Sequence, residues 1–144
     1  MNNFVIDVNV LFSALISGKK IYKTIFTNNK FYAPDFALIE IEKYEETILN
    51  KTKLTAEELK DFTLSLFSKI TFVPKFVMSK EIIQEAYNIC EDIDPKDTLY
   101  IALSMFLKYP LITRDKKLMN KLKEKGFNSI IYFEDFISTF TELQ

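Results

Sequence analysis

Short apolar runs alternate with segments of helical periodicity along the chain. The runs are rich in Val, Ile, Phe and Tyr, and five of them predict buried strands, at residues 4–6, 30–33, 70–73, 110–113 and 129–132. The segments between them repeat apolar residues every three or four positions, which predicts amphipathic helices. Strands that alternate with helices predict an α/β fold, in which a parallel sheet has helices on both faces.

Local signals indicate where these helices begin and end. The segment from Thr55 to Glu58 has the form of a capping box, and Gly18 and Gly126 are expected to end the helices before them. Pro34 is expected to open a helix that runs to about Asn50. The other helices are predicted at residues 10–16, 21–26, 55–67, 79–90, 94–106, 116–125 and 134–140.

The composition restricts the chemistry more than it restricts the fold. The 144 residues include no His, one Cys and two Gly, and no linker or repeat divides them, so we expect a single domain over residues 1–144. Without His there is no Ser-His-Asp or Cys-His catalytic unit, and a structural zinc site lacks ligands. Gly18 and Gly126 lie too far apart to form a phosphate-binding loop. Any catalysis therefore depends on carboxylates, Lys, hydroxyls or a bound metal.

Charge and hydropathy set expectations about partners and location. The formal net charge of −1 provides no general attraction for nucleic acid, so a polyanion would need a local basic patch. The hydrophobic content of 48% indicates either an oligomer face or a Phe-rich core. We expect a cytoplasmic protein with no membrane association, because neither a signal peptide nor a long apolar stretch is seen and a single Cys suits a reducing compartment.

Two Asp residues lie where a parallel sheet binds its ligands, and two more open a helix whose N-terminus could face the same edge. Asp7 follows the first strand directly and Asp115 follows the fourth, and ligands of such sheets bind at the carboxyl ends of strands. Asp94 and Asp97 open a later helix around Pro95. Each of the four has a second interpretation, because Asp at a helix start also caps free backbone amides. An acid in a first helical turn can equally hold a cation over the strand ends.

The helix after the second strand contributes further acids. Glu42, Glu45 and Glu46 share a side that is expected to face solvent. Glu40 follows Ile39 near the point where the helix leaves the sheet, which favours it weakly as a site residue, and Glu42 stays an alternative.

Four stretches of the chain, taken in order, resemble the PIN-domain nucleases, a family that includes the VapC-like ribonuclease toxins. The stretches are Phe4–Leu11, Pro34–Lys43, Asp94–Leu103 and Leu111–Leu118, and the resemblance extends from Phe4 to Phe140. It implies a three-layer α/β/α PIN-like fold with a central parallel sheet.

The resemblance also implies a set of site residues. The catalytic and metal-binding acids would be Asp7, Glu40, Asp97 and Asp115, with Asp94 as an accessory metal ligand and Asn9 and Thr113 as supporting residues. Carboxylates within about 4 Å of one another repel by roughly 4 kcal/mol per pair at an effective dielectric near 20, so such a cluster needs a cation. Oxygen ligands without His or Cys favour Mg²⁺ or Mn²⁺.

The activity implied by the resemblance is metal-dependent endoribonuclease cleavage of RNA phosphodiester bonds. The toxin role, a cognate antitoxin and a homodimer are implied in the same way. Arg114, Lys116 and Lys117 are candidates for RNA binding, although Lys on a surface helix is commonly just solvated.

Two alternatives to a metal-dependent endoribonuclease stay open. One is a noncatalytic PIN-like module that binds RNA or protein, and the other is a phosphohydrolase with Asp7 as a covalent nucleophile, which is weakened because Asn9 replaces its second Asp.

Overall fold

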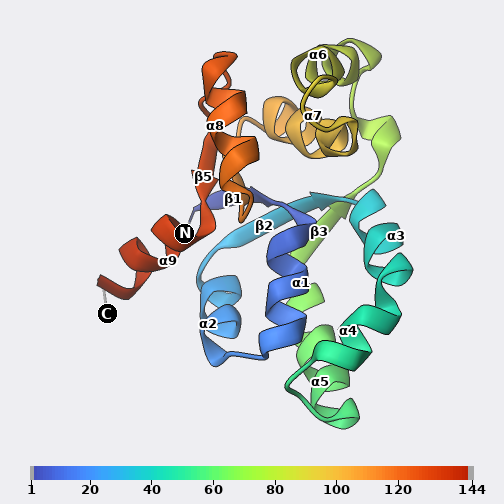
Figure 1. Cartoon of the computed structure of the whole chain (residues 1–144), viewed down its shortest axis with the longest axis vertical. Coiled ribbons are helices and arrows are strands. Elements are labelled where there is room, and N and C mark those ends of the chain that lie inside the picture. Colours follow the sequence, from blue (N-terminus) through green and yellow to red (C-terminus); the bar gives the residue numbers. More distant parts are fainter. Residues whose placement is uncertain (1, 143–144) are drawn as a thin grey trace.

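The strands of residues 2–142, the part of the chain described by the computed structural model, form one parallel sheet in the order β3-β2-β1-β4-β5 (Figure 1). Residues 1, 143 and 144 of the expected domain and the side chains of residues 140–142, which include Phe140, lie outside the described part. The strands are β1 (Asn3–Ile6), β2 (Lys30–Pro34), β3 (Ile70–Val73), β4 (Leu111–Thr113) and β5 (Ile130–Tyr132). Each lies within one residue of its predicted bounds.

Helices cover both faces of the sheet, so the predicted three-layer α/β/α architecture is confirmed (Figure 1). On one side lie α1 (Val8–Ser17), α2 (Lys20–Asn28), α3 (Phe36–Lys43), α4 (Glu45–Lys51) and α5 (Ala56–Phe67). On the other lie α6 (Lys80–Cys90), α7 (Thr98–Leu107) and α8 (Lys116–Glu124). The last helix, α9 (Phe133–Glu142), packs against β4 and β5, and two 3-10 turns, η1 (Lys75–Val77) and η2 (Pro95–Asp97), precede α6 and α7.

One helix prediction is wrong. Pro34 ends β2 instead of opening a helix, and the helix expected to reach Asn50 is divided at Tyr44, whose φ of −102° and ψ of 17° leave the helical range. The Tyr44 ring lies edge-on to Phe12 of α1, with centroids 5.4 Å apart, so packing between helices fixes the break. The other helix signals hold. Thr55 forms the capping box, and Gly18 has a left-handed φ of 63°.

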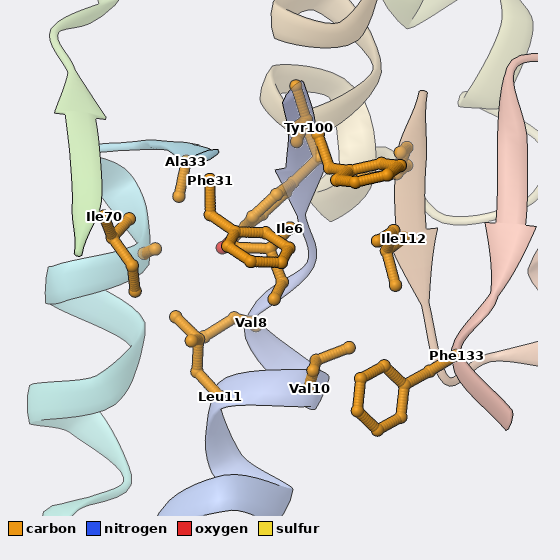
Figure 2. Close-up of a cluster of buried hydrophobic side chains, with 14 of the residues drawn as sticks. Ile6, Val8, Val10, Leu11, Phe31, Ala33, Ile70, Tyr100, Ile112 and Phe133 are labelled. Atoms are coloured by element: carbon orange, nitrogen blue, oxygen red, sulfur yellow. The ribbon is translucent and has the colours of Figure 1, made fainter. Parts of the chain in front are cut away.

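The core accounts for much of the high aromatic content. Phe26 and Phe31 are both 1% exposed, with ring centroids 4.4 Å apart, and they belong to a cluster to which β1, β2, α1 and α7 all contribute (Figure 2).

The chain also carries exposed apolar side chains. Leu38, Leu49 and Leu64 line a groove of about 760 Å³ between α3, α4 and α5. The Phe-rich core is therefore present, and apolar surface is present beside it.

The strand order places the topological switch point between β1 and β4. The chain runs outward from β1 through β2 to β3, and then continues on the other side of β1 with β4 and β5. Successive crossovers on opposite sides of a strand leave a crevice at the carboxyl ends of the two strands where the direction changes. Within residues 2–142 no helix is both long and apolar enough to cross a membrane.

Candidate metal centre

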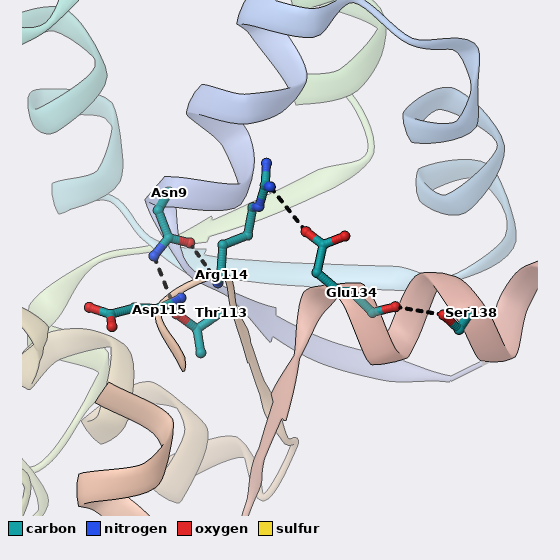
Figure 3. A network of polar contacts seen from close by, with 6 residues as sticks. All are labelled: Asn9, Thr113, Arg114, Asp115, Glu134 and Ser138. Carbon is teal, nitrogen blue, oxygen red and sulfur yellow. Dashed lines mark hydrogen bonds and ion pairs between the residues drawn. The ribbon is translucent and has the colours of Figure 1, made fainter. Parts of the chain in front are cut away.

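Asp7, Asn9 and Thr113 connect the carboxyl ends of β1 and β4. The register pairs Ile6 with Ile112, so the residues that follow, Asp7 and Thr113, lie side by side. The Thr113 hydroxyl donates to Asp7 Oδ2 at 2.9 Å, and Asn9 Nδ2 donates to the same oxygen at 3.2 Å. Asn9 also bridges to the next strand, because its Oδ1 accepts from the backbone amide of Arg114 at 3.1 Å (Figure 3). These contacts fix the Asp7 carboxylate in a buried position at the switch point.

The four aspartates divide into two pairs by the capping criterion. Asp115 Oδ1 accepts from the amide of Leu118 at 2.9 Å and caps α8, and Asp94 Oδ1 accepts from the amide of Lys96 at 3.0 Å at the start of η2. Asp7 and Asp97 precede α1 and α7 but make no side-chain cap hydrogen bond. The capping interpretation therefore applies to Asp94 and Asp115 and not to the other pair.

A small cavity brings three of the acids together. Asp94, Asp97 and Asp115 line a cavity of about 140 Å³, which is bordered by the side chains of Lys117 and Lys121 of α8. Asp94 caps η2 and Asp97 ends it, whereas Asp115 follows β4 and caps α8, so two segments that are separate in the sequence supply these acids.

Glu40 and Glu42 point to different surroundings. Glu40 Oε1 accepts a hydrogen bond of 2.6 Å from the hydroxyl of Tyr100 in α7, and Glu40 is half-buried. Glu42 is exposed and lines the apolar groove on the other side of α3. Of the two candidates, Glu40 is the one whose charge influences Asp7 and Asp97.

Burial and mutual repulsion raise the pKa values of these carboxyls. Burial is the main cause that raises the pKa of Asp7 to about 6, against the opposing effect of the Thr113 hydrogen bond. Burial also raises the pKa of Asp97 to about 8, and the charges of Asp7, Asp94, Asp115 and Glu40 add to it. The pKa of Glu40 is raised by burial, although the bond from Tyr100 partly offsets this.

In the part of the chain that the structure describes, no basic side chain forms an ion pair with these acids. The ion pairs found within residues 2–142 are Lys60 with Glu57, Arg114 with Glu134 and Lys125 with Asp92. The site therefore concentrates negative charge that nearby Lys side chains, such as Lys96 for Glu40, offset only at longer range than an ion pair. Such charge is costly unless protons or a cation neutralise it.

The donor set fits a hard divalent cation in chemistry and in charge. It consists of carboxylate oxygens, with the Asn9 amide and the Thr113 hydroxyl behind Asp7, which is the oxygen chemistry that Mg²⁺ and Mn²⁺ bind. These carboxylates are too far apart to hold an ion in their present positions. In the described part of the chain, no group of three or more Asp, Glu or Cys side chains lies close enough together to bind a metal ion. Asp7, Glu40, Asp97 and Asp115 would have to draw together around one.

The candidate RNA-binding cations lie around this edge with different partners. Arg114 Nη2 pairs with Glu134 Oε1 of α9 at 3.0 Å, a partner that the sequence did not suggest (Figure 3). Lys116 Nζ lies 5.8 Å from the ring centroid of Tyr132, and Lys117 borders the acid-lined cavity.

Tyr100, whose hydroxyl donates to Glu40, is not among the site residues that the sequence predicted. A Tyr three residues after Asp97, in a helix that is otherwise mostly apolar, is the signal that could have found it.

The carboxylates of this parallel α/β protein, with neither His nor Cys among them, thus lie at the switch point, where sheets of this kind bind their ligands. A family model of the PIN domain matches residues 5–129, and the chain belongs to the PIN-domain family. PIN domains are typically nucleases, and those nucleases generally use divalent metal ions. No curated protein was found that matches this chain.

Proposed function

We propose that this protein is an endoribonuclease that hydrolyses RNA phosphodiester bonds with Mg²⁺ or Mn²⁺. The observation that carries the proposal is the set of carboxylates at the β1–β4 switch point, which no basic side chain of the described part neutralises through an ion pair. In this proposal Asp7, Glu40, Asp97 and Asp115 hold the cation, and Asp94 is accessory.

A bound divalent cation would activate water and stabilise the charge that develops on the phosphodiester. The chain's own residues prepare the site for it. Thr113 and Asn9 hold Asp7 Oδ2, so this carboxylate keeps one orientation at the end of β1. The pKa of Asp97, raised to about 8, favours a proton on this carboxyl at neutral pH. That proton would have to leave before Asp97 could bind a cation, so the affinity for the cation should increase with pH.

Substrate phosphates would be bound by cations at the rim of the acidic centre. Lys117 borders the cavity formed by Asp94, Asp97 and Asp115, so a phosphate beside the carboxylates would lie within its reach. Arg114 is oriented by Glu134 and its backbone is tied to Asn9, which supports a role in clamping a phosphate. Lys116 begins α8 and directly precedes Lys117 in its first turn.

The toxin role, the cognate antitoxin and the homodimer are proposed from the resemblance to VapC-like toxins. A cytoplasmic location is proposed with them, supported by Cys90, which is free and buried. Growth arrest on expression, and its relief by the product of a small neighbouring gene, would test the toxin role. Light scattering of the purified chain would test the homodimer.

The test of the activity is cleavage of fluorescently labelled single-stranded RNA in Mn²⁺ and in EDTA, with single-stranded DNA as a second substrate. We expect Mn²⁺-dependent RNA cleavage that falls more than about a hundredfold in Asp7→Asn and Asp97→Asn. Asp61→Asn, an exposed acid on α5, is the matched control and should cleave like the wild type. Cleavage that persists in both site variants would contradict the proposal. RNA binding without cleavage would favour a noncatalytic module, and preferred cleavage of DNA would exclude RNA as the substrate.

A further inference from the structure

The buried hydroxyl of Tyr100 is committed to one oxygen of Glu40. Tyr100 is 1% exposed, and its hydroxyl donates to Glu40 Oε1 at 2.6 Å, across sixty residues of sequence. A buried phenol needs a hydrogen-bond partner, and a charged acceptor makes the bond short and strong. No other hydrogen bond reaches the Glu40 carboxylate within the described residues, so Tyr100 is what fixes it there.

Tyr100 and Asp97 lie together at the start of α7. Asp97 ends η2 and is the N-cap residue of α7, and Tyr100 follows three positions later in the first turn of that helix. That helix packs on β1 and β2, the strands that precede Asp7 and the helix of Glu40. The junction of η2 and α7 therefore supplies both an acid of the site and the group that orients another acid.

Tyr100 also accounts for which glutamate of α3 faces the site. Glu42 lies only two residues from Glu40 but is exposed beside the apolar groove, and no hydrogen bond from α7 reaches it. We propose that Tyr100 is a positioning residue that holds Glu40 for cation binding by occupying its Oε1 and leaving Oε2 for the ion. This inference rests on the proposed metal-dependent function.

The test compares Tyr100→Phe with the wild type by calorimetric titration of Mn²⁺ alone. Removal of the hydroxyl should weaken Mn²⁺ binding about ten- to hundredfold while the KM for RNA stays unchanged. Excess Mn²⁺ should restore most of kcat, which a general structural defect would not allow. Tyr109→Phe is the matched control, because Tyr109 is half-buried against Tyr32 and its hydroxyl makes no hydrogen bond within residues 2–142, so its affinity for Mn²⁺ should equal that of the wild type.

A double-mutant cycle separates this inference from its alternatives. In a Glu40→Gln background, Tyr100→Phe should cause little additional loss of Mn²⁺ affinity, because Tyr100 acts through Glu40. Unchanged binding by Tyr100→Phe, or losses that simply add, would overturn the role of Tyr100 while leaving the proposed function intact. A wild-type chain that neither binds Mn²⁺ nor cleaves RNA would overturn the proposed function and this role together.

Discussion

Two pairs of aspartates meet at one edge of the sheet, and they use their carboxylates differently. Asp94 and Asp115 accept backbone amides at the start of a turn and of a helix, so their charge supports the local fold. Asp7 and Asp97 also precede helices but cap neither, and their raised pKa values show that the folded chain resists their ionisation. Carboxylates that cost stability and cap nothing are those expected to be kept for chemistry.

Neutralising Asp7 should increase the stability of the folded chain, because this carboxyl is the most deeply buried of the acids at the site. The folded chain binds the proton of the Asp7 carboxyl more tightly than the unfolded chain does. Protonated Asp7 therefore makes its full contribution to the free energy of unfolding below pH 3.8, and this contribution is lost as the pH rises through about 6. At pH 8 without divalent cations, Asp7→Asn should therefore be more stable than the wild type by about 3 kcal/mol. Urea unfolding in EDTA between pH 4 and 8 measures this.

The control for the urea experiment on Asp7→Asn comes from the capping pair, Asp94 and Asp115. Asp115→Asn keeps a capping oxygen and removes a charge at an exposed position, so no comparable gain should follow. A difference between Asp7→Asn and the wild type that did not grow with pH would show that burial of the Asp7 charge is not what costs stability.

A bound cation should offset the loss of stability that ionised Asp7 and Asp97 cause. At Mn²⁺ concentrations about a hundred times Kd, binding stabilises the folded chain by about 2.7 kcal/mol, and most of the dependence on pH should disappear. Asp97→Asn should lose this stabilisation, because Asp97 is the acid most affected by the other carboxylates. Thermal melting in EDTA and in Mn²⁺ measures the effect, and an equal shift in the variant would exclude Asp97 from the cation site.

Local patterns were enough to predict the framework of the fold. The apolar run before Asp7 and the capping box at Thr55 are encoded within a few residues, and both are present in the structure. The break at Tyr44 is different, because it depends on packing against Phe12 of another helix. Helical periodicity continues through Tyr44 and contains no sign of that contact.

The site was predictable as a set of positions and not as a set of contacts. Asp at a helix start has the same sequence pattern whether or not it caps, so Asp97 and Asp115 could not be separated before their hydrogen bonds were seen. The bond from Tyr100 to Glu40 joins residues sixty positions apart, and the pair between Arg114 and Glu134 joins β4's end to α9. Such pairings are decided by which elements the topology brings together.

The smallest expected change in stability comes from removing the capping carboxylates of Asp115 and Asp94. Asp115→Ala removes the acceptor for the Leu118 amide, so it should lower the free energy of unfolding by about 1 kcal/mol in EDTA. Asp115→Ser keeps a capping oxygen and should recover most of this loss. Asp94→Ala should cost less, because η2 is a single turn of three residues. Urea unfolding at pH 7 checks all three variants. The capping pair should thus lose stability where Asp7→Asn gains it, and a gain in Asp115→Ala would mean that Asp115 belongs with the acids whose charge the fold resists.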